Sequence, residues 1–436
     1  MIETETSILG AGWAGLLSAK KEIETNKRIT LIDKDTESNL GGLLKSKDID
    51  GFLFDVGGPH LLFSRDENIL GRIKDILGEN CSKLARNNFV RYYDQYIPYP
   101  FENGIYKLET EKRIKIGREL IEKMIFQAQH SEWKPETFMD WITGFFGDLM
   151  SNEYLIPYNK KIWKRPLDKI AADWVFSPGR LPFPQLNDVL KSVAGVESIG
   201  YKEQAFFYYP KSGGIYSLYK NYLDEITSKG VNILGGKRIS KIEKEKSGNF
   251  IINGDVKANR IINTIPLPEV LDAIDEKYSD LSSKFDWNSV VIVGVAISQP
   301  TPNQTTVYVP DPDIVFHRYT WMSAFIHPKD KNTSNIIAEI TVPKNELIDL
   351  KEIEKKTING LIRCGAIKDE NKVLFSTSWV NKYGYPIYSL DHNVNREKAL
   401  SILEEYGIKS VGRWGSWHYW NTDMVMKAVD NTFKTK

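Results

Sequence analysis

Cysteine is nearly absent from this sequence. Only Cys81 and Cys364 occur among 436 residues, and they lie far apart along the chain. A disulfide framework or a cysteine-based metal site needs more thiols than these, so both are excluded. Residues 2–5 carry acids where a secretory signal would have a basic segment. Two lone thiols and no signal pattern predict a cytoplasmic protein.

Net charge and long apolar runs are also missing. Lys and Arg total 58 against 57 Asp and Glu, which leaves a net charge of +1. A balanced chain has no electrostatic reason to bind nucleic acid or an anionic membrane surface. No apolar run approaches the roughly 18 residues that a membrane span requires. We therefore expect no nucleic-acid partner and no membrane span.

The histidines show no metal-ligand spacing. Five of the six are spread along the chain without an H-x-x-x-H pattern: His130, His317, His327, His392 and His418. No Ser-His-Asp arrangement or P-loop signature is visible either. We expect no metal site, and we interpret these five histidines as structural.

The chain opens with a recognisable nucleotide-binding pattern. Residues 6–35 predict a strand, a glycine turn, a helix and a second strand, with Gly10, Gly12 and Gly15 in the turn and Asp33 ending the second strand. The glycines let the backbone approach a pyrophosphate at the positive end of the helix, and the acid can accept from a ribose hydroxyl. This motif predicts a dinucleotide cofactor but does not distinguish NAD from FAD.

The remaining periodicity predicts a mixed α/β protein. Helical spacing occurs at 68–78, 112–129, 394–406 and from about 422, and residues 136–173 look mainly helical. Strand patterns occur at 231–234, 250–252, 260–266, 289–297, 305–309, 335–342 and 373–379. Helical and all-strand segments thus interrupt the nucleotide-binding unit. We expect a discontinuous Rossmann-type domain that the chain leaves and re-enters.

A second glycine pattern favours FAD. Asn39-Leu40-Gly41-Gly42 follows the second strand, and Gly57-Gly58-Pro59-His60 comes soon after. Their positions resemble the second signature of FAD enzymes in the superfamily of amine oxidases and UDP-galactopyranose mutases. In that superfamily this segment continues from the adenosine toward the flavin.

Further motifs resemble the UDP-galactopyranose mutase branch along the whole chain. Gly58-Pro59-His60 is similar to its G-P-H loop, which implies that His60 lies over the flavin near N5. Tyr99-Pro100-Phe101 resembles its Y/L-P element, and Lys211–Tyr216 resembles its P-K-G-G-Y segment with one residue inserted. Residues 158–163 resemble its Y-x-x-K-Q-W segment, which implies that Tyr158 and Trp163 help to form a uridine pocket.

Three arginines fall on motifs of the same branch. Arg180 resembles the arginine of its K-R-L-P motif and Arg318 that of its Y-T-R motif, and both contact the substrate diphosphate in that family. Arg413 resembles the arginine of a G-R-L-G motif beside the flavin. Two guanidinium groups would match the two charges of a diphosphate with bidentate donors. Glu339, Tyr385 and Tyr419 resemble a strand carboxylate and two diphosphate-binding tyrosines.

The resemblance implies a complete set of site residues. Catalytic roles fall to His60, Arg318 and Arg413. Substrate binding falls to Tyr158, Trp163, Arg180, Arg318, Glu339, Tyr385 and Tyr419. The expected cofactor residues are Gly10, Gly12, Trp13, Ala14, Gly15, Asp33, Lys34, Gly41, Gly42, Leu43, Gly58, Pro59, His60, Gly412, Arg413, Tyr419, Asn421, Thr422, Asp423 and Met424.

Departures from the family pattern gather at the flavin end. Asn421 replaces an acid and Met424 replaces a glutamine, while Phe63-Ser64 stands where the family often has a second histidine. These positions surround the sugar and the pyrimidine end of the flavin in the family. The sequence therefore leaves the exact sugar open more than it affects FAD binding.

The resemblance also implies a domain plan. Residues 1–75, 205–265 and 375–436 would form the discontinuous FAD-binding domain. Residues 104–200 would form an inserted, mainly helical domain. Residues 80–103 and 266–374 would form an antiparallel β-sheet domain on the substrate side.

Two functions follow from the resemblance. The first is a redox-neutral mutase that interconverts UDP-galactopyranose and UDP-galactofuranose through a sugar adduct on N5 of reduced FAD. Its partner would be a nucleoside-diphosphate sugar, with NAD(P)H as a candidate reductant and a homo-oligomer as a candidate assembly. The alternative is an FAD-dependent oxidase or desaturase, which needs neither the diphosphate arginines nor the Tyr158 and Trp163 pair.

Overall fold

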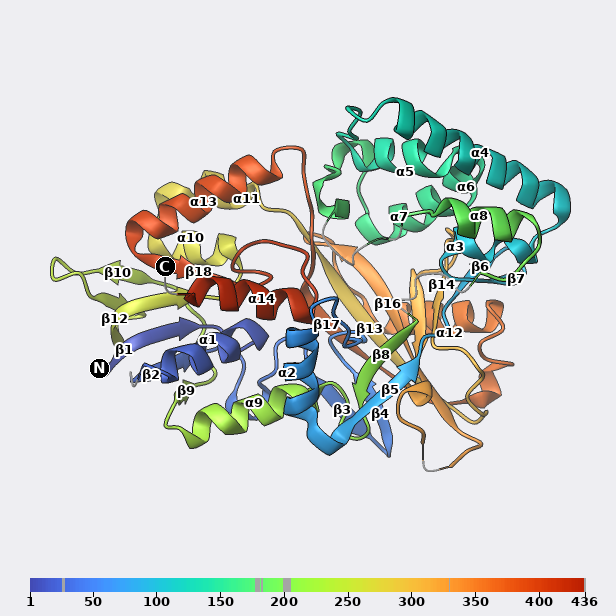
Figure 1. Cartoon of the computed structure of the whole chain (residues 1–436). Helices are drawn as coiled ribbons and strands as arrows, with labels where there is room; N and C mark the ends of the chain where they lie inside the picture. The colour runs from blue at the N-terminus through green and yellow to red at the C-terminus, as the bar shows by residue number, and fades with distance from the viewer. Residues whose placement is uncertain (26–27, 177–180, 182, 199–204, 329, 435–436) are drawn as a thin grey trace.

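The computed structural model describes residues 1–25, 28–176, 181, 183–198, 205–328, 330–434. Two seven-stranded sheets and a group of helices make up the fold (Figure 1). The first sheet lies at the left of the view with helices around it. The second lies at the right, below the helical group.

The first sheet has the order β10-β11-β12-β1-β2-β9, with β18 also paired to β12. Its strands are β1 (Ile2–Leu9), β2 (Ile29–Ile32), β9 (Asn232–Leu234), β10 (Ile242–Lys244), β11 (Phe250–Ile252), β12 (Val256–Asn263) and β18 (Ile408–Ser410). The pairs of β1 with β2 and β12 are parallel, whereas β10 and β11 form an antiparallel hairpin. Strands far apart in sequence therefore complete the unit that the N-terminus begins.

Helices cover both faces of this first sheet. On one face are α1 (Trp13–Ile23), α2 (Glu67–Leu77), α9 (Tyr216–Ser228) and α14 (Thr422–Phe433); on the other are α10 (Leu267–Ile274), α11 (Ser279–Ser283) and α13 (His392–Tyr406). Successive residues of β1 point to opposite faces, so Ile8 packs with the first group and Leu9 with the second. Burial on both faces explains why all four residues of the central strand β2 are buried.

The second sheet has the order β17-β13-β16-β15-β14-β6-β7. Its strands are β6 (Phe89–Tyr92), β7 (Gln95–Pro98), β13 (Trp287–Ile297), β14 (Thr306–Tyr308), β15 (Arg318–Trp321), β16 (Ser334–Pro343) and β17 (Val373–Pro386). Only the β14 and β6 pair is parallel. Along β13, Val291 and Val293 pack toward α12 (Leu350–Arg363), while Ile292 packs toward the main core. This sheet is therefore buried on both faces as well.

A helical group lies at the upper right of Figure 1. It comprises α3 (Phe101–Gly104), α4 (Thr110–Gln129), α5 (Phe138–Phe146), α6 (Asp148–Met150), α7 (Ile156–Trp163) and α8 (Leu186–Val193). A capping box of Thr137 and Asp140 starts α5, since each side chain binds the other residue's backbone N–H. Aromatic rings such as Phe138, Trp141 and Trp163 fill its interior. Most of the aromatic enrichment thus serves packing.

Two short ribbons join the main layers. They are β3 (Ser46–Ile49) with β4 (Phe52–Asp55), and β5 (Cys81–Ala85) with β8 (Phe206–Pro210). The buried carboxylate of Asp55 accepts hydrogen bonds from Ser46 Oγ and Tyr209 Oη, both at 2.6 Å. These bonds connect the two ribbons near the N-terminus of α9.

The predicted fold class is confirmed, and so are most predicted elements. The glycine turn, α2, α4, α13 and α14 occur within a few residues of the predicted bounds, and so do β2, β9, β11, β13, β14 and β16. The sequence patterns did not predict β3 to β8, β15, β18 or the helices α8 to α12. β17 lies in the second sheet, and the division into domains stays a prediction. Among the described residues, no helix is both long and apolar enough to cross a bilayer, and no three His, Cys, Asp or Glu side chains gather as metal ligands.

Candidate functional site

A cavity of about 590 Å³ lies between the carboxyl ends of β1 and β2 and the strand β17. Parallel strands bind ligands at this end of a sheet. Twelve of the predicted cofactor residues line it: Gly10, Gly12, Trp13, Ala14, Asp33, Lys34, Gly42, Leu43, His60, Arg413, Asn421 and Thr422. The structure therefore brings together residues that span the chain from its first strand to its last helix.

The glycines make room for a ligand backbone. A Cβ on Gly15 would lie 2.0 Å from the carbonyl oxygen of Gly10, so only glycine lets α1 pack this closely on the turn. Gly42 has φ +57°, and a Cβ there would stand 3.2 Å from Cα of Gly12. Two side-chain-free segments thus face each other at the start of α1. This arrangement fits a dinucleotide whose pyrophosphate lies at the helix N-terminus.

Asp33 lies directly after β2 and is held in place by the backbone. Its Oδ2 accepts from the Ala11 N–H at 2.6 Å and its Oδ1 from the Asp35 N–H at 2.8 Å. Burial raises the pKa of Asp33, and these two N–H groups work against that shift. Each oxygen keeps a further lone pair, so the carboxylate can still accept from a ribose hydroxyl.

A second cavity of about 200 Å³ adjoins the first. Six residues line both cavities: Leu43, His60, Asn381, Arg413, Asn421 and Thr422. The predicted residues Gly58, Pro59, Arg318, Glu339, Tyr385 and Tyr419 line only the second. The two cavities therefore meet at His60 and Arg413.

Arg318 and Glu339 form an ion pair in the wall of the second cavity. They face each other across β15 and β16, and the guanidinium contacts both carboxylate oxygens, with Nη2 at 2.8 Å from Oε2. The Tyr385 hydroxyl donates to the same Oε2 at 3.2 Å. Burial works to lower the pKa of Arg318, but Glu339 outweighs it and raises that pKa well above its usual value. Arg318 is therefore a fixed, permanently charged donor.

Arg413 is half-buried and held by carbonyl groups. Its Nη1 donates to the Trp420 oxygen at 3.0 Å and its Nη2 to the Gly384 oxygen at 2.6 Å. The guanidinium also lies 4.6 Å from the ring centre of Tyr419. Burial lowers the pKa of Arg413 to about 10, and Arg318 contributes to that shift. In the described part of the chain none of its partners is a carboxylate, so its positive charge acts on the point where the cavities meet.

His60 has an electrically neutral ring. Burial lowers its pKa to about 3, with smaller contributions from the positive charges of Arg413 and Arg318. Its Nε2 has no hydrogen-bond partner among the described residues. A buried nitrogen without a partner at the junction of two cavities fits a site that a ligand completes.

We expect the His60 ring to stay neutral from pH 8 down to about pH 4. Because its pKa is lowered from about 6.5 to about 3, protonation disfavours the folded state, so His60 makes the fold lose stability as pH falls through that interval. Histidine NMR shifts recorded against pH would measure this, with His60→Gln identifying the signal. Titration of that signal near pH 6.5 would contradict the assignment.

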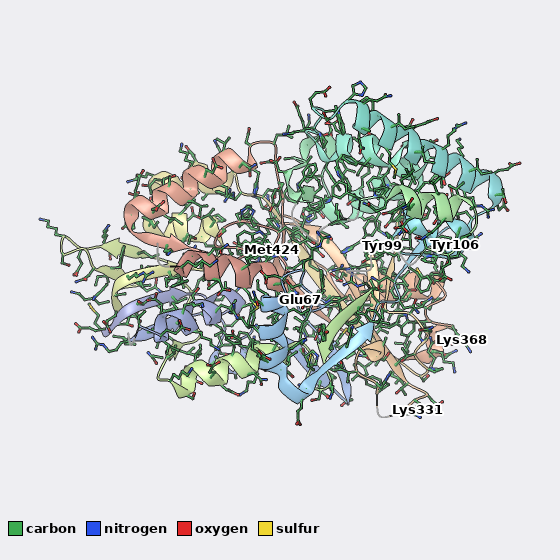
Figure 2. The ribbon with its side chains drawn as sticks, viewed as in Figure 1. Glu67, Tyr99, Tyr106, Lys331, Lys368 and Met424 are labelled. Carbon is green, nitrogen blue, oxygen red and sulfur yellow. The ribbon has the colours of Figure 1, made fainter. Side chains whose placement is uncertain are left out.

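Several predicted residues lie outside the lining of both cavities. Trp163 packs edgewise on Tyr419 at 6.0 Å, and Tyr158 packs edgewise on Tyr308 at 5.7 Å, so both form a layer behind the wall. Five others do not appear in either lining: Gly15, Gly41, Gly412, Asp423 and Met424. Figure 2 labels Met424 at the start of α14. Arg180 lies outside the described residues, and the roles of all these side chains stay predictions.

The second cavity is also lined by residues that were not predicted as site residues. Arg86, Phe63, Asn88, Tyr99 and Tyr308 contribute to its lining. Tyr99 was noticed only as part of a motif, and Figure 2 labels it on the right-hand half of the molecule, below the helical group. No local pattern predicts a binding role for Arg86 or Asn88, because they lie in the loop between the short strands β5 and β6, which the sequence did not predict.

Tyr388 supports the segment between Arg413 and Asn421. Its hydroxyl accepts from the Tyr419 backbone N–H at 2.9 Å and lies 3.2 Å from His418 Nδ1. His418 in turn stacks on Trp420, with ring centres 4.5 Å apart. His418 thus has the structural role expected from the sequence, and it acts on residues that line the cavity.

Comparisons with known proteins agree with this geometry. A profile described as an NAD(P)-binding Rossmann-like domain matches residues 8–78. An uncharacterized protein of the nifH2 3′ region in Methanothermococcus thermolithotrophicus is 31% identical over 109 residues, which are 25% of this chain and 87% of that protein. Its name assigns it no activity.

Solved structures resemble the chain over nearly its whole length. A reduced UDP-galactopyranose mutase aligns with TM-score 0.86 and 22% identity, covering 99% of this chain and 93% of that one. A candidate protoporphyrinogen oxidase from Exiguobacterium sp. 255-15 aligns with TM-score 0.76 and 16% identity, covering 99% and 98%. A putrescine oxidase variant aligns with TM-score 0.67 and 15% identity, also covering 99% and 98%. Identities this low establish the shared fold and leave the activity to be argued from the site.

Proposed function

We propose that this chain, which belongs to the same family as the Methanothermococcus protein and has the fold of UDP-galactopyranose mutase, is an FAD-dependent sugar-nucleotide mutase. Its proposed reaction interconverts the pyranose and furanose forms of a nucleoside-diphosphate sugar, with UDP-galactose as the expected substrate. NAD(P)H is the proposed reductant. The cytoplasm is the proposed compartment, because the sugar nucleotide and NAD(P)H are both found there.

The observation that carries this proposal is the joining of two different cavities. One is lined by the glycine turn and an acid, which suit a dinucleotide cofactor. The other is lined by three arginines and a single carboxylate, Glu339, which suit a ligand with two negative charges. They meet at His60 and Arg413, so the bound substrate would lie against one end of the cofactor.

The lining residues divide naturally into roles along the proposed FAD. Gly10, Gly12 and Gly42 would admit the pyrophosphate, and Asp33 would bind the adenosine ribose. His60 and Arg413 would contact the flavin end. Reduced flavin would supply the nucleophilic nitrogen that displaces the nucleoside diphosphate from the sugar.

The chain's own side chains would then control the leaving diphosphate. Arg318 offers fixed donors toward the negative charge that develops as the sugar–phosphate bond breaks. Glu339 holds that guanidinium in place, and Tyr385 bonds to the same carboxylate. His60 stays neutral and can exchange one hydrogen bond through Nε2 without adding charge beside the sugar.

The oxidase alternative rests on the structural likeness to two oxidases. A cationic amine would be repelled by the arginines of the second cavity. The same arginines would attract a substrate that carries carboxylates. The test must therefore distinguish the mutase from an oxidase that acts on an anionic molecule.

The direct test is product analysis. Protein reduced with dithionite would be incubated without oxygen with UDP-galactopyranose or UDP-galactofuranose, and the mixtures separated by HPLC. Both incubations are expected to approach the same ratio of the two isomers. If neither sugar nucleotide changes, while an anionic substrate is oxidised by the air-exposed protein, the alternative replaces the mutase.

We expect the purified protein to be yellow and to release FAD on heat denaturation. The expected spectrum is that of a bound flavin, because the glycine turn, Asp33 and His60 all line the larger cavity. Gly42→Val should give largely colourless protein, since its Cβ branch would enter the space beside Gly12 at a backbone φ of +57°. The matched control is Gly51→Val, which also has positive φ but meets nothing within 4 Å. Colourless wild-type protein that binds only NAD would refute the cofactor assignment.

A further inference from the structure

Arg86 occupies a well-fixed loop beside the second cavity. Its backbone N–H donates to the Ala205 oxygen at 2.8 Å. The next residue, Asn87, donates from its backbone to Thr305 Oγ1 at 3.0 Å, and Thr305 donates to Asn88 Oδ1 at 2.6 Å. This bonding joins the loop to the start of β14, so the position of Arg86 is determined by the second sheet.

The side chain of Arg86 is supported by an aromatic ring. Its guanidinium lies over Phe63, 5.1 Å from the ring centre, and both side chains line the second cavity. A guanidinium over an aromatic face gains a cation–π interaction and loses side-chain freedom. Phe63 is one of the departures from the mutase pattern, so this pair is a feature of this chain.

Three guanidinium groups from three different elements share this small space. Arg318 comes from β15, Arg413 follows β18, and Arg86 follows β5. Burial lowers the pKa of Arg86 and of Arg413, and the charge of Arg318 adds to both shifts. Among the described residues of the lining, the one carboxylate is Glu339, which is bound to Arg318 through both oxygens. Like charges gathered in this way are stabilised by a bound anion.

The neighbours of Arg86 indicate which part of a ligand it would meet. Its charge interacts with Tyr99, Tyr308 and Arg318. Arg318 is the residue to which we assign the diphosphate, whereas Arg413 and His60 adjoin the cofactor cavity. Arg86 therefore belongs to the diphosphate side of the second cavity.

We propose that Arg86, held over Phe63, is a specificity-determining residue that binds the diphosphate of the substrate together with Arg318. This inference rests on the proposed function for the identity of the substrate. It adds a residue that neither the motifs nor the comparisons single out. A purely structural Arg86 would not discriminate between charged and neutral ligands.

The experiment measures binding without turnover, by calorimetry on the air-oxidised holoprotein. The ligands are UDP, inorganic pyrophosphate and uridine, and the variants are Arg86→Gln and Arg86→Lys. Arg118→Gln is the matched control, because Arg118 is an exposed residue of α4 paired only with Glu122 in the described contacts. Flavin absorbance and circular dichroism verify that each variant is folded.

Arg86→Gln is expected to weaken UDP and pyrophosphate binding by about 10- to 100-fold and to leave uridine binding unchanged. Arg86→Lys should lose less affinity for these two anions, since lysine keeps the positive charge but lacks the planar guanidinium group. Binding of both anions should also depend less steeply on salt in Arg86→Gln than in the wild type or in Arg118→Gln.

Unchanged affinity for UDP and pyrophosphate in folded Arg86→Gln overturns the inference, and so does an equal loss for uridine. If Arg86→Gln does not fold, Arg86→Lys decides in its place by the same comparison of charged and neutral ligands. Wild-type protein that binds neither anion overturns it too. Wild-type protein that binds UDP through Arg86 but forms no furanose overturns only the proposed function.

Discussion

Isomerase activity is expected to be near zero in protein purified under air and to appear when dithionite is added without oxygen. The proposed reaction needs a reduced flavin as nucleophile but consumes no electrons over a cycle. Product should therefore accumulate far beyond the amount of reductant supplied. HPLC of the two sugar nucleotides measures this directly when dithionite is supplied in an amount far smaller than that of the substrate.

An oxidase would show the opposite dependence. It would start from oxidised flavin and consume one acceptor for each product formed, so oxygen uptake recorded in parallel separates the two reactions. His60→Ala serves as the variant for this comparison because His60 lies where the cavities meet. It should slow isomerisation while leaving the flavin spectrum in place. Steady oxygen uptake with no furanose formed would favour the oxidase.

Arg318→Ala is expected to lose both substrate binding and stability. Removing one charge-assisted contact to a diphosphate should weaken UDP binding by about 10- to 150-fold. The same change leaves Glu339, which is only 3% exposed, as a buried carboxylate without its ion pair. Loss of one partner of a buried pair typically costs about 3–5 kcal/mol of unfolding free energy. Calorimetry and urea denaturation would measure the two effects separately.

A second substitution separates these two losses. Glu339→Gln added to Arg318→Ala removes the buried charge, so stability should largely return while UDP binding stays weak. Arg260→Ala is the matched control, because Arg260 of β12 contacts the buried Glu22 of α1 at 2.9 Å. It should lower stability and leave UDP affinity unchanged. Recovery of UDP binding in the double variant would show that Arg318 acts only through the fold.

Local patterns predicted the cofactor half of the site well. The glycine turn and Asp33 lie within 24 residues, so one strand-turn-helix-strand unit brings them together without help from the rest of the chain. The sequence did not predict the register in which β1 pairs in parallel with β12. That pairing completes the sheet, but the N-terminal motif already defines the end of the sheet at which the cofactor site lies. Helix α9 could also have been predicted, because its buried residues follow a helical spacing: Leu218, Tyr219, Tyr222 and Ile226.

The second cavity could be predicted only in part. Motif resemblance named Arg318 and Glu339 separately, but their pairing depends on the register of β15 against β16. Arg86 was missed because β5 pairs with β8, more than 120 residues away, and neither strand shows a clear alternating pattern. Contacts over such separations leave no periodic signal in a single sequence.

By itself, the sequence determined the dinucleotide turn, the order of most helices and strands, and the absence of a cysteine framework, because each depends on residues close together or on composition. Only the tertiary structure decided that two cavities meet at His60 and Arg413, and that Arg86 joins Arg318 on one side of the second. The physical reason is that charge and burial at a site are sums over neighbours in space. Those neighbours come from strands and loops whose pairing is chosen by the packing of the whole chain.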